Sequence, residues 1–257
     1  MDWLNSCAGF AVGLLVGFTG VGGGALMTPL LVLMFGVAPQ TAVGTDLLYA
    51  TVTKSVGSFV HGAFGGVDWY VLRRLWLGSL PAAVATLMLL RGGSISDDLA
   101  RLILPVLGAS LIFTGAIMLA SRRLLERLTE STFPERLKPF QSLMTVGAGG
   151  VLGFLVTLTS VGAGAIGAVM LIYLYPKRLR GQKLVGTDIV HAIPLTLVAG
   201  FGHAQLGHVN YGLLGMLLLG SIPGIVIGSY LSHKVSAPVI RKAIAVMLII
   251  VGIKLVI

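Results

Sequence analysis

The tetrapeptide Val-Gly-Thr-Asp occurs twice in this chain, ending at Asp46 and at Asp188. With only nine acidic residues in 257, a carboxylate repeated in the same setting is a candidate for chemistry. Each Asp precedes an apolar stretch, and Thr45 is a plausible helix N-cap. Two interpretations stay open for the aspartates. They stabilise a helix start through its dipole, or they bind a proton or coupling ion inside a membrane.

Lys54 lies two helical turns beyond Asp46 in the same apolar stretch. An ionisable residue at such a depth is costly and usually faces a partner or a watery path. An ammonium group there would attract an anion. A structural ion pair with Asp46 is the alternative, although the two residues are about 12 Å apart along a helix. The second copy has Thr196 at the equivalent position, which argues against a purely symmetric structural role.

Polar and small residues continue from each Asp at spacings of four, four, three and four, which places them on one face of a helix. We expect both helices to line a cavity with this face. Its histidines, His61 and His203, could carry protons near neutrality or make hydrogen bonds at the helix ends. The stripes are Asp46, Ala50, Lys54, Gly57 and His61, and Asp188, Ala192, Thr196, Ala199 and His203.

A glycine-rich segment precedes a short apolar run in both copies: Gly20-Val-Gly-Gly-Gly24 and Gly162-Ala-Gly164. Glycine allows positive φ and close approach of a ligand to the backbone. A helix starting after it would direct free amides at an anion. The alternative is that small residues only permit close helix crossing. The candidate anion-binding residues are Gly22, Gly23, Gly24, Thr45, Lys54, Gly162, Ala163, Gly164 and Thr187, and the coupling candidates are Asp46, Asp188, His61 and His203.

The composition indicates a polytopic membrane protein. Hydrophobic residues make up 56% and charged residues 11%, against about a quarter charged in soluble domains. The net charge of +9 lies in short connections, as membrane-orienting charge does, so a nucleic-acid partner is not expected. The sequence contains no zinc-like spacing, phosphate loop or nucleophile–base arrangement. We therefore expect neither an enzyme, nor a metal, nor a cofactor.

The duplication extends well beyond the tetrapeptide. At an offset of 142 residues, Leu77-Gly-Ser-Leu-Pro81 matches Leu219-Gly-Ser-Ile-Pro223 without a gap. Self-similarity of this length indicates two copies of one structural unit. We divide the chain into a first transmembrane repeat (1–120), a basic cytoplasmic linker (121–139) and a second transmembrane repeat (140–257).

Each copy contains five apolar runs, of which the second is short. At 11–13 residues it reaches about 16–20 Å, less than the hydrocarbon core of about 30 Å. We expect either helices lengthened by their glycines or broken, re-entrant hairpins. Both give an odd number of net crossings per copy, so the copies must be inverted. The runs are Leu4–Thr19, Ala25–Val37, Leu47–Phe64, Val71–Leu90 and Leu102–Ala120, then Ser142–Leu158, Ala165–Tyr175, Ile189–Leu206, Tyr211–Leu231 and Val239–Ile257.

The basic residues agree with inversion. With the amino terminus outside, 14 of the 18 Lys and Arg fall in inward connections, as the positive-inside rule requires. Arg91, Arg101 and Lys254 fall outward. The expected fold is an all-α polytopic membrane protein made of two inverted repeats.

The same residues carry a family resemblance. Gly20-Val-Gly-Gly-Gly24, then Pro29-Leu30, then Ala42-Val-Gly-Thr45, with the pattern repeated downstream, resembles the TauE/SafE group of sulfite-exporter-like membrane proteins. The resemblance covers essentially the full chain. It implies movement of sulfite, thiosulfate, sulfoacetate or another organosulfonate across a prokaryotic cytoplasmic membrane. The family often has Ser after Gly-Thr, where both copies here have Asp, so it leaves substrate and coupling open.

We therefore expect an inner-membrane transporter of a small anion that works by alternating access, with the bilayer as its surroundings and protons as a candidate coupling ion. Two alternatives remain open. A passive anion channel would share the glycines and the lysine but show neither counterflow nor saturation. A non-transporting scaffold would explain the hydrophobicity but not the duplicated polar stripe.

Overall fold

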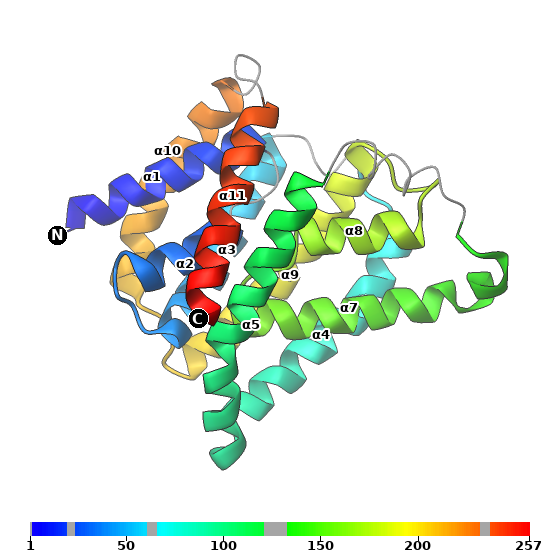
Figure 1. Ribbon diagram of the computed structural model, residues 1–257, viewed down its shortest axis with the longest axis horizontal. Coiled ribbons are helices and arrows are strands. Elements are labelled where there is room, and N and C mark those ends of the chain that lie inside the picture. Colours follow the sequence, from blue (N-terminus) through cyan, green and yellow to red (C-terminus); the bar gives the residue numbers. More distant parts are fainter. Residues whose placement is uncertain (1, 20–23, 61–65, 121–132, 232–236) are drawn as a thin grey trace.

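The computed structural model describes residues 2–19, 24–60, 66–120, 133–231 and 237–257 (Figure 1). These ranges contain helices and connections and no strand. The prediction of an all-α polytopic membrane protein is confirmed. The helices are α1 (Asp2–Thr19), α2 (Gly24–Leu33), α3 (Pro39–Val60), α4 (Trp69–Arg91) and α5 (Gly93–Leu119), the short η2 (Glu135–Phe140), then α7 (Gln141–Thr159), α8 (Ala165–Leu174), α9 (Gln182–Gln205), α10 (Tyr211–Leu231) and α11 (Ala237–Val256).

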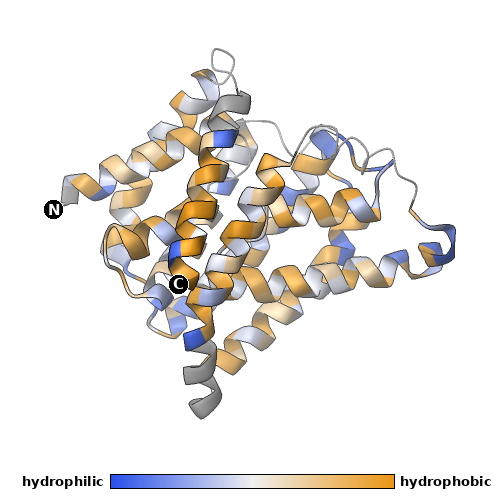
Figure 2. Cartoon of the chain, viewed as in Figure 1, coloured by the Kyte–Doolittle hydropathy of each residue, from blue (hydrophilic) through white to orange (hydrophobic). Residues whose placement is uncertain are grey.

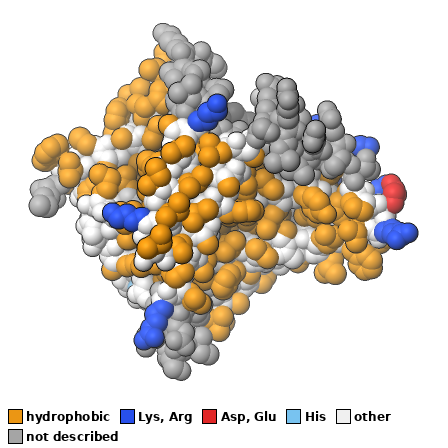
Figure 3. Space-filling model, viewed as in Figure 1, with side chains coloured by type: hydrophobic (Ala, Val, Ile, Leu, Met, Phe, Trp, Pro, Cys, Tyr) orange, Lys and Arg blue, Asp and Glu red, His pale blue; other side chains and the backbone are white. Residues whose placement is uncertain are grey.

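The outer surface is apolar, as a lipid-facing surface must be. Figure 2 shows that hydrophobic residues dominate the helices, and in Figure 3 hydrophobic side chains cover much of one face. Within the described residues, four segments are long and apolar enough to cross a membrane: Arg101–Leu119, Glu135–Thr159, Gln182–Gln205 and Tyr211–Leu231. Helices α2 and α8 have ten residues each, or about 15 Å, so the predicted short second segments are confirmed.

Two pairs of equivalent helices, α3 with α9 and α5 with α11, pack antiparallel. In α3 and α9, Thr51 lies against Thr196 while the earlier Gly44 lies against the later His203. Figure 1 shows α5 and α11 side by side and running in opposite directions, and the two helices are in contact. This is the relation between equivalent helices that inverted copies require.

The two halves also interlock, because α1 packs on α10 and α4 packs on α7. Glycines permit the close approach. A Cβ on Gly13 of α1 would lie 2.4 Å from the Ser221 carbonyl oxygen, and one on Gly149 of α7 would lie 2.3 Å from the Leu75 carbonyl oxygen. Small residues bring helix backbones together in this way in membranes. Each half therefore completes its packing with a helix of the other.

One expectation about the helix starts is wrong. Thr45 was expected to cap its helix, with Asp46 in the first turn. Helix α3 begins at Pro39 and α9 at Gln182, so both aspartates lie inside their helices. Proline at the first helical position is a favourable start, since its missing N–H has no intrahelical partner there. The dipole at a helix start therefore does not explain the aspartates.

Candidate functional site

Asp46 joins the central helix α3 to the short helix α2. Its carboxylate is fully buried, and Oδ2 accepts hydrogen bonds from the backbone N–H of Thr28 (3.2 Å) and from the Thr28 hydroxyl (2.5 Å). The other oxygen, Oδ1, is buried without a hydrogen-bond partner among the described residues. A carboxylate with two donors on one oxygen is held in one orientation.

Lys54 reaches from α3 to the segment that precedes α8. The side chain is buried, with 5% of the residue exposed, and its ammonium donates to the carbonyl oxygen of Ala163 at 3.4 Å. The carboxylates that attract it are Asp188 on α9 and, more weakly, Asp46. The structure thus brings together one cation, one aspartate of the other half and the glycine segment of the other half.

The glycine segment before α8 has the backbone that the sequence predicts for it. Gly162 and Gly164 have φ values of +129° and +131°, and Ser160 has φ of +60°. Only glycine adopts the first two readily, so the chain can turn sharply between α7 and α8. The equivalent residues Gly22 and Gly23 of the first half lie outside the described residues, and Gly24 is the first residue of α2.

Asp188 lies near both this segment and Lys54. The backbone of Gly164 faces its carboxylate. Its Oδ1 is buried without a hydrogen-bond partner among the residues described, and a Cβ on Gly167 would lie 2.4 Å from that oxygen. Gly167 thus leaves room for the carboxylate against α8. Each aspartate therefore lies against the short helix of its own half, but only Asp46 is tied to it through a side chain.

The hydroxyls of Thr45 and Thr187 hold the starts of neighbouring helices. Thr45 Oγ1 accepts from the backbone N–H of Asn210 at 3.0 Å, before α10, and Thr187 Oγ1 accepts from the backbone N–H of Asp68 at 2.9 Å, before α4. The two contacts are equivalent under the repeat. Both hydrogen bonds hold the starts of these helices, and the part of the two threonines in anion binding stays a prediction.

Of the two predicted histidines, only His203 lies within the described residues. His61 lies outside the described residues. His203 is buried near the end of α9, where its Nε2 lies 2.9 Å from the Thr157 carbonyl oxygen and its Nδ1 lies 3.3 Å from Nδ1 of His208. Both ring nitrogens are therefore engaged with α7 and with the connection that follows α9.

Three buried residues near the aspartates were missed by the sequence reasoning. Thr28 is the partner of Asp46. His191, one turn after Asp188, has Nε2 2.9 Å from the Ser79 hydroxyl and an Nδ1 without a described partner. Tyr49, its repeat equivalent, is fully buried. His191 lies three residues after Asp188, a spacing that places both on one face of a helix, so the sequence could have indicated it. Thr28 lies on another helix, and nothing in the sequence indicates its contact with Asp46.

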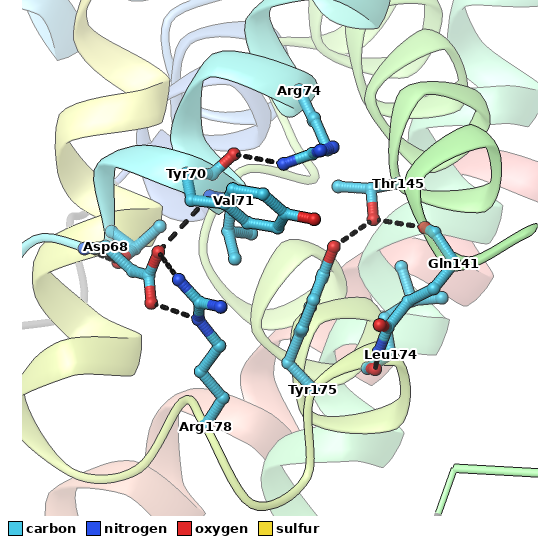
Figure 4. A network of polar contacts seen from close by, with 10 residues as sticks. Asp68, Tyr70, Val71, Arg74, Gln141, Thr145, Leu174, Tyr175 and Arg178 are labelled. Carbon is cyan, nitrogen blue, oxygen red and sulfur yellow. Dashed lines mark hydrogen bonds and ion pairs between the residues drawn. The ribbon is translucent and has the colours of Figure 1, made fainter. Parts of the chain in front are cut away.

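A second polar network ties α4, α7 and the α8–α9 connection together (Figure 4). Arg178 donates to both oxygens of Asp68, at 2.6 and 3.0 Å, while Asp68 also accepts from the Val71 amide at the start of α4. Burial raises the pKa of Asp68, but the hydrogen bonds from Arg178 and Val71 outweigh it and hold the pKa below its usual value. The guanidinium of Arg178 also lies 4.7 Å from the ring centroid of Tyr70.

Comparison with known proteins places this arrangement in a family. Residues 6–255 match the family described as Sulfite exporter TauE/SafE. The chain belongs to the TauE/SafE family. It is therefore an integral membrane transporter and not an enzyme.

Curated relatives of this TauE/SafE protein carry transporter names. The chain is 38% identical over 253 residues to the probable membrane transporter protein YjnA of Bacillus subtilis, covering 96% of this chain and 97% of the relative. It is 25% identical to YdhB of the same organism, with 91% and 92% covered. It is 24% identical to MJ0441 of Methanocaldococcus jannaschii, with 93% and 88% covered. No solved structure matches the chain.

Proposed function

We propose that this transporter moves a small sulfur-containing anion, such as sulfite, thiosulfate, sulfoacetate or another organosulfonate, across the prokaryotic cytoplasmic membrane. The family description supports the substrate class. Inverted-repeat transporters place their substrate between the copies, beside broken helices. The crossing of α3 and α9, next to the broken segment before α8, is that place in this chain.

The observation that carries the proposal is the position of Lys54. Its buried ammonium is held by a backbone carbonyl of the glycine segment and faces a carboxylate of the opposite half. A buried cation without a tight ion pair is costly, so a structural role alone would favour an apolar residue here. The second half has Thr196 at this position, so the packing of the copies does not require a lysine.

Asp188 supplies a reason for proton coupling. Its carboxylate lies where an anion held by Lys54 and by the amides near Gly164 would lie. Two like charges about 4 Å apart repel by about 4 kcal/mol even at an effective dielectric constant of 20. Protonation of Asp188 removes that repulsion and frees Lys54 for the substrate. Asp46, held by Thr28 through two hydrogen bonds, is the weaker candidate, and His203 has both ring nitrogens engaged.

Alternating access then follows from the antiparallel copies. The antiparallel packing of α3 on α9 supports copies that face opposite sides of the membrane. Rocking of one copy against the other would expose Lys54 to each side in turn. The distribution of Lys and Arg supports an orientation with the starts of α4 and α9 on the cytoplasmic side.

The test is counterflow of radiolabelled thiosulfate, sulfite and sulfoacetate into proteoliposomes preloaded with the unlabelled anion. We expect saturable counterflow of at least one of these anions. Lys54→Ala should lower its initial rate by about tenfold or more, since a hydrogen bond to a charged group contributes about 1.5–3 kcal/mol. An inward-directed proton gradient should stimulate net uptake by the wild-type protein and leave Asp188→Asn unaffected.

Lys254→Ala serves as the matched control, because Lys254 is an exposed lysine near the end of α11. Undiminished counterflow in Lys54→Ala would remove the lysine from the site. Net flux without counterflow in the wild-type protein would instead indicate a passive channel. A proton response that persists in Asp188→Asn would assign the coupling elsewhere.

A further inference from the structure

We infer that the exposed start of α4 binds the headgroup of an anionic phospholipid. An open pocket of about 440 Å³ lies there, lined by Trp69, Tyr70, Arg73, Arg74 and Leu77. These five residues come from the first three turns of one helix face. The inference requires only that the exposed apolar side chains of α4 face lipid, so it is independent of what the protein transports.

The local charge at this pocket is positive. The carboxylate of Asp68, one residue before Trp69, is already bound by Arg178 through two hydrogen bonds and is thus not available to Arg73 and Arg74. Arg73 is exposed. An acidic group is thus the complementary ligand, and arginine is well suited to phosphate because its planar donors can bind two oxygens together.

Arg74 is already ordered for such a contact. Its Nη1 donates to the Tyr70 carbonyl oxygen at 3.2 Å, and its guanidinium carbon lies 3.4 Å from the Tyr70 ring centroid. Arg178 lies on the same ring at 4.7 Å, and Figure 4 shows Tyr70 between the two arginines. Because the Arg74 side chain is already held in place, it loses less conformational entropy when a ligand binds.

The surroundings identify the ligand as a lipid and not a free anion. After the arginines along α4, apolar side chains are exposed: Leu77 is 67% and Met88 69% exposed. Trp69 and Tyr70, both exposed, stand at the end of this stripe, where aromatic residues mark the membrane–water boundary. An acyl chain can therefore lie along the outside of α4 while its phosphate meets Arg73 and Arg74.

The preference should be for an acidic phospholipid over a zwitterionic one. The phosphate of phosphatidylcholine is offset by its own choline, whereas phosphatidylglycerol leaves a net negative charge for the two arginines. Each Lys or Arg near a membrane surface contributes about 1 kcal/mol toward anionic lipid, which is about fivefold in affinity. Together Arg73 and Arg74 should give a preference of about 25-fold.

The test uses the fluorescence of Trp69, which is the only tryptophan left after Trp3→Phe and Trp76→Phe. The protein is reconstituted into phosphatidylcholine vesicles that contain increasing fractions of phosphatidylglycerol brominated near the headgroup end of its chains. We expect about 25-fold stronger association, measured by quenching, than with brominated phosphatidylcholine. The preference should fall about fivefold in Arg73→Gln and disappear in Arg73→Gln/Arg74→Gln.

Arg91→Gln is the control, because Arg91 is an exposed arginine at the other end of the same helix; it should keep the preference. Arg73 projects from the surface, so the single variant tests the site without disturbing the packing of Arg74 on Tyr70. Equal quenching by the two brominated lipids in the parent protein would overturn the inference. Abolition of the preference by millimolar inorganic phosphate would also overturn it, since the site would then bind soluble anions.

Discussion

Asp68 and Asn210 occupy equivalent positions in the two copies and cap the helix that follows in the same way. Asp68 accepts from the Val71 amide, and Asn210 Oδ1 accepts from the Leu213 amide at 3.0 Å. Only Asp68 adds an ion pair, to Arg178. Asn210 therefore caps its helix without a charge. Comparing Asp68 with Asn210 separates the contribution of helix capping from that of the ion pair.

Asp68→Asn should lower the free energy of unfolding by about 1 kcal/mol or less at pH 7, because Asn caps a helix as well as Asp does and the Arg178 side chain of the lost ion pair is half exposed. The folded-state pKa of Asp68 is depressed, so the stabilisation is fully present above the unfolded-state pKa of about 3.9 and is lost as the pH falls through the folded value. The difference between wild type and variant should thus shrink below about pH 4.

Thermal unfolding in detergent across this pH range measures the difference. Asp68→Ala is the companion variant, since it removes the cap as well and should cost about 1 kcal/mol more. A wild-type advantage over Asp68→Asn that persists unchanged well below pH 4 would contradict the assignment of the stabilisation to the ion pair.

The sequence predicted part of the site at this scale. Lys54, Asp188 and the residues near Gly164 were all singled out, because ionisable residues in apolar helices and duplicated glycines are informative without a partner. The partners were not predictable. That Asp46 bonds to Thr28, or that Thr187 bonds to the start of α4, depends on how separate helices pack, which the spacing along one helix does not determine.

At the scale of elements, glycines that recur along one helix face determine which helices pack closely. In α1, Gly9, Gly13 and Gly17 recur at intervals of four, and they face the backbone of α10. Such spacing was visible in the sequence as a helix-crossing motif, but its partner was not. The sequence analysis also placed the start of α3 too late, because Thr45 was taken for its N-cap, whereas the helix begins at Pro39.

Gly13→Ala should destabilise the protein by about 1–3 kcal/mol, the usual cost of overpacking. Its Cβ would lie 2.4 Å from the Ser221 carbonyl oxygen, a backbone atom that cannot move alone. Gly147→Ala in α7 is the control, since a Cβ there meets nothing within 4 Å and should stabilise the helix by up to about 1 kcal/mol. Unfolding by sodium dodecyl sulfate measures both. Equal stability of the two variants would contradict the close packing of α1 on α10.

At the scale of the whole molecule, the duplication predicted the arrangement well and the packing poorly. Two copies with odd crossings require inversion, and the antiparallel contacts of α3 with α9 and of α5 with α11 have that geometry. The sequence did not predict that α1 packs on α10 of the other copy, or that α7 packs on α4 of the other copy. Exchanged packing of this kind depends on surface complementarity between helices that lie far apart in the sequence.

The central claim is that the copies face opposite sides of the membrane, so that Lys54 and Asp188 meet between them. The most direct measurement is labelling of Val67→Cys and Val209→Cys, equivalent positions before α4 and α10, by a membrane-impermeant maleimide in cells that express the protein with Cys7→Ser. We predict that Val209→Cys reacts in intact cells and Val67→Cys reacts only after the membrane is opened. Reaction of both positions from the same side would contradict the inverted arrangement and the site built on it.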